Sequence, residues 1–287
     1  MTKWQQIKAL FLSGAILLCL LTSGYAAVDQ DSVDVADAAD KYTVYVDGQA
    51  EYMGYVIDGV DYVPLRSFAN SLHMGAVVKH AAMGSTMTVD FMAPDGRACT
   101  LTARVGDVYL YINDRIVYLG AEILKLNGNV LVPMNGLCAA FGITAEAARD
   151  YAVLNTDRLQ VAADGSGVYD AETLKWLSHI INAEAGNQSL EGQICVGNVV
   201  LNRVADERFP DSVKAVVFSP NQFCPVKSGS IWCTPDADAV AAAKLCLEGV
   251  NLAGDSTYFV NPTTGSTRWF RENLTYVMSV GDHDFYC

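Results

Sequence analysis

The chain has 287 residues, of which 51% are hydrophobic and 18% are charged, a composition that fits folded domains and excludes a disordered chain. This length is sufficient for two domains of ordinary size. The formal net charge of −13 argues against nucleic acid and anionic membrane surfaces as partners, because like charges repel.

Residues 1–26 have the pattern of a secretory signal peptide. Lys3 and Lys8 accompany an apolar run, and the Gly-Tyr-Ala stretch at 24–26 offers small residues to a signal peptidase. The apolar run is shorter than the roughly 20 residues that cross a bilayer, so we expect cleavage and a secreted protein. Cleavage removes two lysines and no acid, which moves the net charge from −13 to −15. Residues 27–40 are predicted to be a flexible segment.

The cysteines suggest one disulfide and no metal site. Cleavage removes Cys19, one of eight cysteines, and leaves seven. Cys224 and Cys233 lie close together in a loop-like stretch, and we predict that they pair outside the cell. Cys195 and Cys246 lie within apolar helical patterns and are predicted to be small buried residues. No Cys-x-x-Cys pair or zinc-type spacing occurs, so no metal or cofactor is predicted.

Residues 41–160 contain an internal repeat with an offset of 69 residues. The segment Asp58–Leu65 recurs as Asn127–Met134. Each copy predicts a tight Asp-Gly or Asn-Gly turn, a strand that ends at a proline, and a short helix with one apolar face. Alternating apolar residues at 87–91 and 151–154 predict a closing strand for each copy.

The doubled G-x4-P motif resembles the N-terminal domain of copper amine oxidases over about residues 41–158. This resemblance implies a binding or spacing module of α+β type without an active site. We expect no copper, because His73 and His80 are the only histidines in this half and two histidines are a poor ligand set. Both are predicted to be surface residues.

Residues 161–170 are predicted to be a linker, because they contain an Asp-Gly-Ser-Gly stretch. Beyond them the pattern becomes helical. Asp170 is placed to cap a first helix, and further helices are predicted at 193–204 and 235–247. The predicted fold is therefore a two-domain α+β protein, with a duplicated strand/helix module followed by a mainly helical domain at 171–287.

Glu184 is the candidate catalytic acid. It continues the row Leu177, Ile180 and Ile181 at helical spacing, which predicts that it points to the buried face of its helix. An apolar setting raises the pKa of a carboxyl group, and a protonated acid near neutral pH can donate to a glycosidic oxygen. Alternatively the helix ends at Gly186, and Glu184 lies in a solvated last turn.

The motifs around Glu184 are ordered along the whole domain: Leu177–Gly186, Gly192-Gln193, Val196–Val204, Phe209-Pro210, Gln222-Phe223, Tyr258-Phe259 with Asn261-Pro262, and Gly281–Tyr286. Together they resemble the cell wall hydrolase family typified by the spore cortex-lytic enzymes, over about residues 172–287. That family implies a lysozyme-like, lytic transglycosylase-like fold. It also implies a glycan substrate of alternating N-acetylglucosamine and N-acetylmuramic acid.

The family's catalytic glutamate, in its E-A-x-G motif, falls on Glu184. The chain departs from the family pattern in two places. Its glycine, Gly186, comes one residue earlier than in E-A-x-G and is followed by Asn187 in place of the usual acidic residue, and Cys224 stands where a small residue usually follows the Q-F motif. Neither departure removes the catalytic acid.

The resemblance suggests a lytic transglycosylase, in which Glu184 acts first as acid and then as base on the muramic acid C6 hydroxyl, leaving a 1,6-anhydro end. A retaining or inverting glycosidase needs two carboxylates. No second acid lies within a matching motif, and Asp282 and Asp284 lie in a polar tail. A water-using muramidase remains an alternative, and the substrate stays open between vegetative wall and spore cortex.

The substrate groove is predicted to contain amide, hydroxyl and ring side chains from the remaining motifs: Gln222, Phe223, Tyr258, Asn261 and His283. Core packing is an alternative for Tyr258, because alternation along a strand buries one face. His283 is more often structural when it stands alone. Asn202 and Arg203 are predicted to fix the second helix of the domain and not to contact substrate.

Two other function classes are open at this stage. One is a non-catalytic wall-binding protein with a decayed hydrolase domain. The other is an amidase or peptidase, which would need zinc or a pair such as Cys224 with His283. The leading prediction is a secreted, cell-wall-associated monomer with a role in sporulation or germination. It binds peptidoglycan glycan strands, and it needs no nucleic acid, membrane, cofactor or metal.

Overall fold

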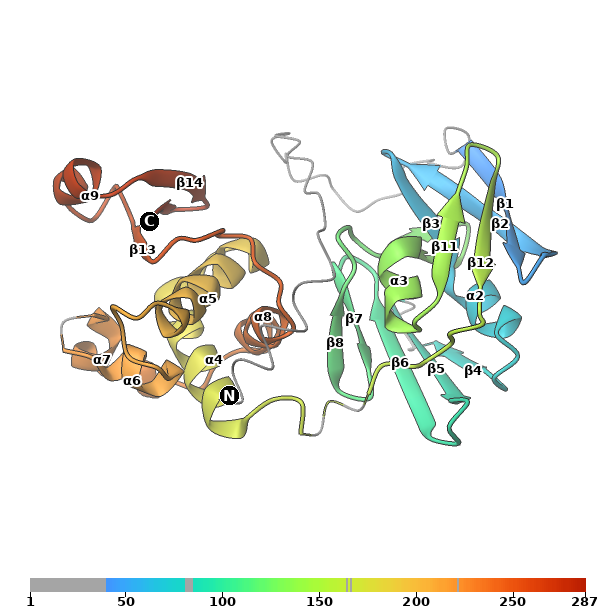
Figure 1. Cartoon of the computed structure of the whole chain (residues 1–287), viewed down its shortest axis with the longest axis horizontal. Helices are drawn as coiled ribbons and strands as arrows, with labels where there is room; N and C mark the ends of the chain where they lie inside the picture. The colour runs from blue at the N-terminus through green and yellow to red at the C-terminus, as the bar shows by residue number, and fades with distance from the viewer. Residues whose placement is uncertain (1–39, 81–84, 164, 166, 221) are drawn as a thin grey trace. The chain divides into compact units, whose positions relative to one another are not determined.

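The structure is a computed structural model that describes residues 40–80, 85–163, 165, 167–220 and 222–287 (Figure 1). Ala38–Cys287 forms one compact unit. The predicted signal peptide at 1–26 and all but the last residue of the predicted flexible segment lie outside the described residues. In the part of the chain that is described, no helix combines the length and the apolar character needed to cross a membrane.

Among its described residues, the N-terminal region contains two sheets and two short helices, α2 and α3. The larger sheet has the strand order β11-β12-β1-β2-β3-β10-β9, and its only parallel pair among these strands is β1 with β12. The smaller sheet is an antiparallel meander in the order β4-β5-β6-β7-β8. The bounds are β1 Asp40–Val46, β2 Gln49–Ile57, β3 Val60–Pro64, α2 Leu65–Ser71, β4 Val77–His80, β5 Thr86–Met92, β6 Ala98–Arg104, β7 Tyr109–Ile112, β8 Arg115–Tyr118, β9 Leu124–Leu126, β10 Asn129–Pro133, α3 Met134–Ala140, β11 Thr144–Ala147 and β12 Tyr151–Asn155.

The two repeated segments meet at the centre of the larger sheet. β3 and β10 pair antiparallel with Val63 opposite Val132, two residues that lie 69 apart in the sequence. The ladder is therefore symmetric about this pair, and each strand leads directly into a helix, α2 or α3. The predicted turns are present, since Asp58-Gly59 and Asn127-Gly128 all have positive φ, as a two-residue hairpin turn of this type requires.

The closing strands of the two copies differ. The predicted strands at 87–91 and 151–154 exist as β5 and β12, but β5 belongs to the smaller sheet and β12 to the larger. His73 and His80 are exposed, as predicted, and His80 contacts the Arg66 guanidinium at 2.8 Å.

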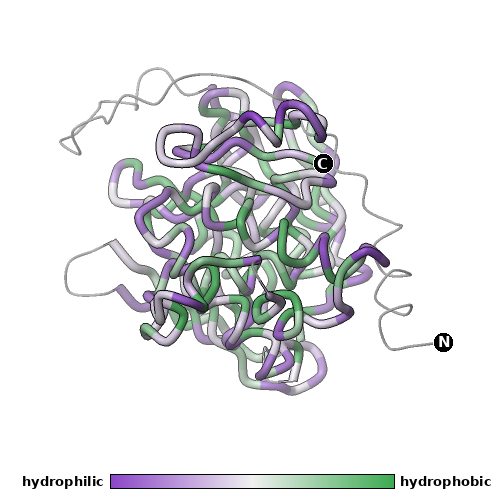
Figure 2. The backbone as a smooth tube through the Cα atoms, turned by 90° about the vertical axis from the view of Figure 1, so that its left-hand side faces the viewer, coloured by the Kyte–Doolittle hydropathy of each residue, from purple (hydrophilic) through white to green (hydrophobic). Residues whose placement is uncertain are grey.

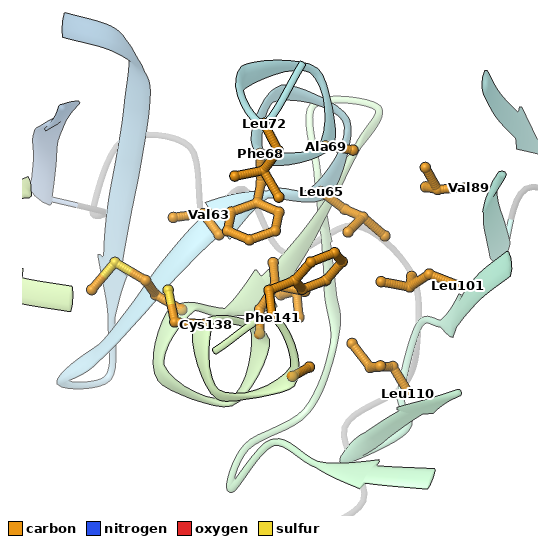
Figure 3. Close-up of a cluster of buried hydrophobic side chains, with 14 of the residues drawn as sticks. Val63, Leu65, Phe68, Ala69, Leu72, Val89, Leu101, Leu110, Cys138 and Phe141 are labelled. Carbon is orange, nitrogen blue, oxygen red and sulfur yellow. The ribbon is translucent and has the colours of Figure 1, made fainter. Parts of the chain in front are cut away.

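The core of this region lies between the helices and the smaller sheet. Figure 3 shows the Phe68 and Phe141 rings next to each other, with Val89, Leu101 and Leu110 pointing toward them. The two ring centroids are 5.3 Å apart at an interplanar angle of 69°. In Figure 2 hydrophobic stretches of the backbone lie mostly in the interior, and hydrophilic stretches lie mostly in the outer turns. Burial of apolar surface produces this distribution.

The C-terminal region is mainly helical, as predicted, and ends in a small antiparallel sheet of order β13-β15-β14, of which the sequence indicated only the strand at Tyr258. Its elements are α4 Ala171–Ala185, α5 Leu190–Ala205, α6 Val213–Phe218, α7 Cys224–Ser228, the 3-10 helix η3 Ser230–Trp232, α8 Ala237–Leu247, β13 Tyr258–Val260, α9 Arg268–Asn273, β14 Tyr276–Val280 and β15 His283–Tyr286.

Side-chain caps decide where these helices begin. Asp170 accepts a hydrogen bond from the Thr173 amide at 2.8 Å, which confirms the predicted cap of α4. Ser189 caps α5, so this helix starts before the predicted residue 193. Asp236 accepts from the Ala239 amide at 2.8 Å, so α8 starts after the predicted residue 235.

The predicted linker, residues 161–170, makes specific contacts near its C-terminal end. The Tyr169 hydroxyl donates to Glu248 Oε1 at 2.7 Å, and Arg115 bonds the same carboxylate through two nitrogens at 2.8 and 2.9 Å. Tyr109 and Ile116, from β7 and β8, are buried in the same apolar cluster as α4 and α8. Within the unit, the strands and the helices therefore share core residues.

Gly197 allows α5 to approach α4 and α8 closely. A Cβ atom at this position would lie 2.7 Å from Cys246 Sγ and 2.8 Å from Ile181 Cδ1, both shorter than van der Waals contact. Cys195 and Cys246 are buried, as predicted. The predicted Cys224–Cys233 disulfide is wrong in this structure, where both thiols are free and exposed. Two local helices, α7 and η3, occupy the segment between the two cysteines.

We expect Gly197→Ala to lower the free energy of unfolding by about 1–3 kcal/mol, because the added methyl group overpacks the contact between the helices. Urea unfolding followed by circular dichroism measures this change. Adding Cys246→Ala removes the sulfur that the methyl group meets, so the double variant should lose less stability than the sum of the two single variants. Strict additivity would contradict the proposed contact.

Candidate active site

Glu184 lies in the last turn of α4, one residue before the final residue of the helix. Its helix buries Leu177, Ile180 and Ile181 in the domain core, and Glu184 itself is half-buried. The sequence left two alternatives for Glu184, a buried helix face and a solvated last turn. Each is correct in part, because the helix does end at this point and yet the side chain is largely removed from water.

Burial raises the pKa of Glu184 to about 7, and the positive charge of Arg203 acts in the opposite direction. Among the described residues no hydrogen bond or ion pair reaches its carboxyl group. The negative end of the α4 dipole also disfavours a carboxylate in the last turn. Glu184 is therefore substantially protonated near neutral pH, which is the state that a general acid needs.

Arg203, on α5, is the buried cation of this region, with 5% of its surface exposed. Its Nε donates to the Thr257 carbonyl oxygen at 2.7 Å, and its Nη1 donates to Gln222 Oε1 at 3.2 Å. Its guanidinium carbon lies 5.1–5.3 Å from the ring centres of Phe209, Phe223 and Tyr258. One side chain thus holds together α5, the segment before α7 and β13.

The sequence predicts that Arg203 fixes its own helix. In the structure Arg203 also binds two other segments of the domain. Its position was detectable, because Val196, Val199 and Val200 form an apolar stripe that Arg203 continues by one more turn. A permanent charge on an apolar stripe requires partners inside the fold. The structure supplies those partners from segments 19 and 54 residues away in the sequence.

Three of the predicted groove residues gather around Arg203. Gln222 is exposed and offers its amide nitrogen to solvent, while its oxygen accepts from Arg203. Tyr258 is half-buried, with its ring against the guanidinium. Phe223 is only 5% exposed beneath Arg203, which favours packing over an open stacking face.

The other two predicted residues, Asn261 and His283, have no described contact with Arg203 and make other contacts. The Asn261 Oδ1 accepts from the amide and the hydroxyl of Thr263, so it stabilises the turn after β13. His283 is buried on β15 with its ring 5.2 Å from that of Phe259. Burial lowers the pKa of His283, and its Nδ1 has no hydrogen-bond partner among the described residues.

The two acids of the closing motif have other contacts. Asp282 accepts from Gln188 Nε2 at 3.0 Å, and Asp284 accepts from the Ser279 hydroxyl. No described hydrogen bond joins exposed Cys224 to buried His283. Within the described ranges no cluster of three metal-ligating side chains occurs.

Residues 187–286 match the model of the Cell Wall Hydrolase family, and residues 30–154 match that of the copper amine oxidase N-terminal domain. The first match begins three residues after Glu184. The chain therefore carries a cell wall hydrolase domain and, before it, a copper amine oxidase N-terminal-like domain.

Spore cortex-lytic enzymes are among the relatives. The enzyme of Oceanobacillus iheyensis is 31% identical over 117 residues, which cover 41% of this chain and 42% of the relative. The enzyme of Bacillus subtilis is 30% identical over 125 residues, which cover 44% of this chain and 41% of the relative. The chain thus spans less than half the length of these relatives.

Two solved structures are similar to the C-terminal part. One is the catalytic domain of the Bacillus cereus SleB protein, with 28% identity, a TM-score of 0.39, and coverage of 42% of this chain and 92% of that one. The other is the catalytic domain of the germination-specific lytic transglycosylase SleB from Bacillus anthracis. It has 28% identity, a TM-score of 0.40, and coverage of 44% and 100%.

The raised pKa of Glu184 predicts a pH-dependent effect on stability. Between pH 4.5 and about 7 the folded chain holds a proton on Glu184 that the unfolded chain has released, so the free energy of unfolding falls as pH rises through this window. Glu184→Gln removes this penalty and should be more stable than the wild type above pH 7, by up to about 3 kcal/mol. The two proteins should converge below pH 4.5. Urea unfolding at several pH values measures the difference, and a constant difference would contradict it.

Removal of the positive charge at Arg203 should raise the pKa of Glu184 above about 7, because the carboxylate loses an attractive charge. Carbon-13 NMR titration of labelled glutamate in Arg203→Met measures this directly. Arg203→Lys keeps the charge and serves as the control, with a pKa close to that of the wild type. A lower pKa in Arg203→Met would contradict the assignment.

Proposed function

Because the chain carries a cell wall hydrolase domain, we propose that it is a secreted enzyme that cleaves peptidoglycan between N-acetylmuramic acid and N-acetylglucosamine. Glu184 is its catalytic acid. The observation that carries this proposal is a half-buried carboxyl group without a described partner, whose pKa of about 7 leaves a large share of it protonated near neutral pH. The proposed fold of the domain is lysozyme-like.

In the first step, Glu184 donates its proton to the oxygen of the glycosidic bond. The bond between this oxygen and C1 of the muramic acid breaks, and positive charge develops on the sugar ring. Glu184 becomes a carboxylate, which the buried Arg203 stabilises through its charge. Glu184 beside the charge of Arg203 is therefore suited to a mechanism in which the carboxyl group loses and regains a proton.

In the second step, the Glu184 carboxylate takes the proton of the C6 hydroxyl of the same muramic acid. The C6 oxygen forms a bond to C1, so the product is a 1,6-anhydro ring and no water is consumed. This lytic transglycosylase route needs one carboxylate. It is supported by the local contacts of Asp282 and Asp284, which accept hydrogen bonds from Gln188 and Ser279, while no described contact joins either acid to Glu184.

The remaining residues would bind the glycan strand. Gln222, whose amide nitrogen has no described hydrogen-bond partner, and Tyr258 are the strongest candidates, because both contact Arg203, whose charge acts on Glu184. Asn261 would contribute its amide nitrogen, whereas Phe223 and His283 would support the groove by packing. In this proposal the N-terminal domain binds the wall or acts as a spacer, and the monomeric enzyme uses no cofactor.

The first test is digestion of purified vegetative and cortex peptidoglycan, with mass spectrometry of the released muropeptides. We expect 1,6-anhydro-muramic ends from the wild type and at least a 1,000-fold loss, on the order expected for a general acid, in Glu184→Gln. Glu207→Gln, at an exposed glutamate, is the matched control and should remain fully active.

Other products would change the proposal in defined ways. Reducing muramic ends would establish a water-using muramidase and require a second carboxylate. Absence of glycan cleavage on both substrates would overturn the enzyme in favour of a wall-binding protein.

The pH dependence gives an independent test of the acid. Activity should decrease as pH rises through about 7, because the general acid loses its proton there. The measurement is kcat/KM against pH with a soluble glycan fragment. A profile that instead rises through pH 7 would mean that an unprotonated base limits the reaction.

A further inference from the structure

Trp269 carries a large exposed ring on a short surface helix. It lies on α9, a six-residue helix between β13 and β14 that has no buried residue (Figure 1). Its side chain is 52% exposed. A single exposed aromatic residue needs no explanation by itself, so its neighbours decide whether it has a role.

The ring of Trp269 continues the aromatic group around Arg203. Its centroid is 6.0 Å from that of Tyr258, and the Tyr258 ring lies in turn 5.3 Å from the Arg203 guanidinium and 6.1 Å from Phe209. A row of rings therefore extends from the buried cation of the candidate site to the surface of α9.

Local contacts hold the Trp269 ring without covering it. The Phe270 ring meets it at 5.4 Å and 87°, and Phe270 is itself packed against buried Tyr286 at 5.5 Å. Asn273 Nδ2 donates to the Trp269 carbonyl oxygen at 2.8 Å. A side chain that is already ordered loses little conformational entropy when it binds a ligand.

The charge of the protein makes ring contacts the more effective source of affinity. With a net charge of −13, the chain gains no general attraction to an anionic wall. The α9 segment differs locally, because it carries two arginines and one glutamate, and Arg268 already pairs with Glu272. Arg271 is exposed on the same helix and suits a carboxylate of a stem peptide.

We propose that Trp269 is a sugar-stacking residue that extends the glycan groove beyond Tyr258 and holds a hexosamine ring away from the cleaved bond. The apolar C–H face of a pyranose ring fits the exposed face of an indole, as is common in concave and open ligand sites lined by aromatic residues. This inference rests on the proposed function, because it adds a binding position to the same groove.

The chain offers a matched control in Trp232. This residue is 63% exposed on η3, so it is at least as accessible as Trp269. Its neighbours are Trp176 at 5.6 Å and Phe218 at 6.0 Å, and no described ring contact joins it to Tyr258 or Arg203. A general effect of removing a surface tryptophan should therefore appear at both positions.

The experiment measures binding of the full mature chain to purified peptidoglycan sacculi by sedimentation, in the inactive Glu184→Gln background. Adding Trp269→Ala should weaken binding about tenfold, equivalent to about 1.4 kcal/mol, while adding Trp232→Ala should leave it unchanged. Trp269→Phe keeps a ring and should recover part of the loss. Near-ultraviolet circular dichroism and thermal unfolding verify that each variant is folded.

In the active background, Trp269→Ala should raise KM on long glycan strands and leave turnover of the shortest cleaved fragment unchanged. Binding equal to that of the parent, or an equal loss in Trp232→Ala, would overturn the proposal. Failure of the proposed function would give a different result. In that case the wild type would release no muropeptides, and the Glu184→Gln parent would not bind the sacculi.

Discussion

The buried guanidinium of Arg203 is the constraint on which the arrangement of this domain depends. A charge removed from water is costly unless its hydrogen-bond donors are satisfied. Here the described partners are a backbone carbonyl, an amide oxygen and three aromatic rings, and none of them is a carboxylate. Because these partners come from separate segments, satisfying one charge fixes the position of Gln222 and Tyr258 relative to α5.

Glu184, in contrast to Arg203, is an ionisable group that the fold leaves without a hydrogen-bond partner among the described residues. Its apolar surroundings and the end of its helix both oppose ionisation, and only the charge of Arg203 favours it. A carboxyl group kept in this way reduces the stability of the fold at neutral pH. Residues that work in proton transfer are commonly held at such a cost, because their pKa must lie near the working pH.

The N-terminal region shows how a repeated sequence can be used unequally. The symmetric pair β3 and β10 places the equivalent residues Val63 and Val132 opposite each other. The strands that follow the two helices then join different sheets, β5 in the smaller and β12 in the larger. The two helices still contribute to one shared core, in which the Phe68 and Phe141 rings contact each other.

Local pattern was sufficient for much of this structure. The sequence by itself determined the Asp58-Gly59 and Asn127-Gly128 turns, the strands and helices that follow them, the cap at Asp170 and the position of Glu184 on an apolar helix face. These features depend on residues within a few positions of one another. Tertiary structure alone decided the β3–β10 register, the final three-stranded sheet, the free state of Cys224 and Cys233, and the partners of Arg203. Each of these depends on contacts between segments far apart in the sequence, and periodicity carries no information about which distant segments will meet.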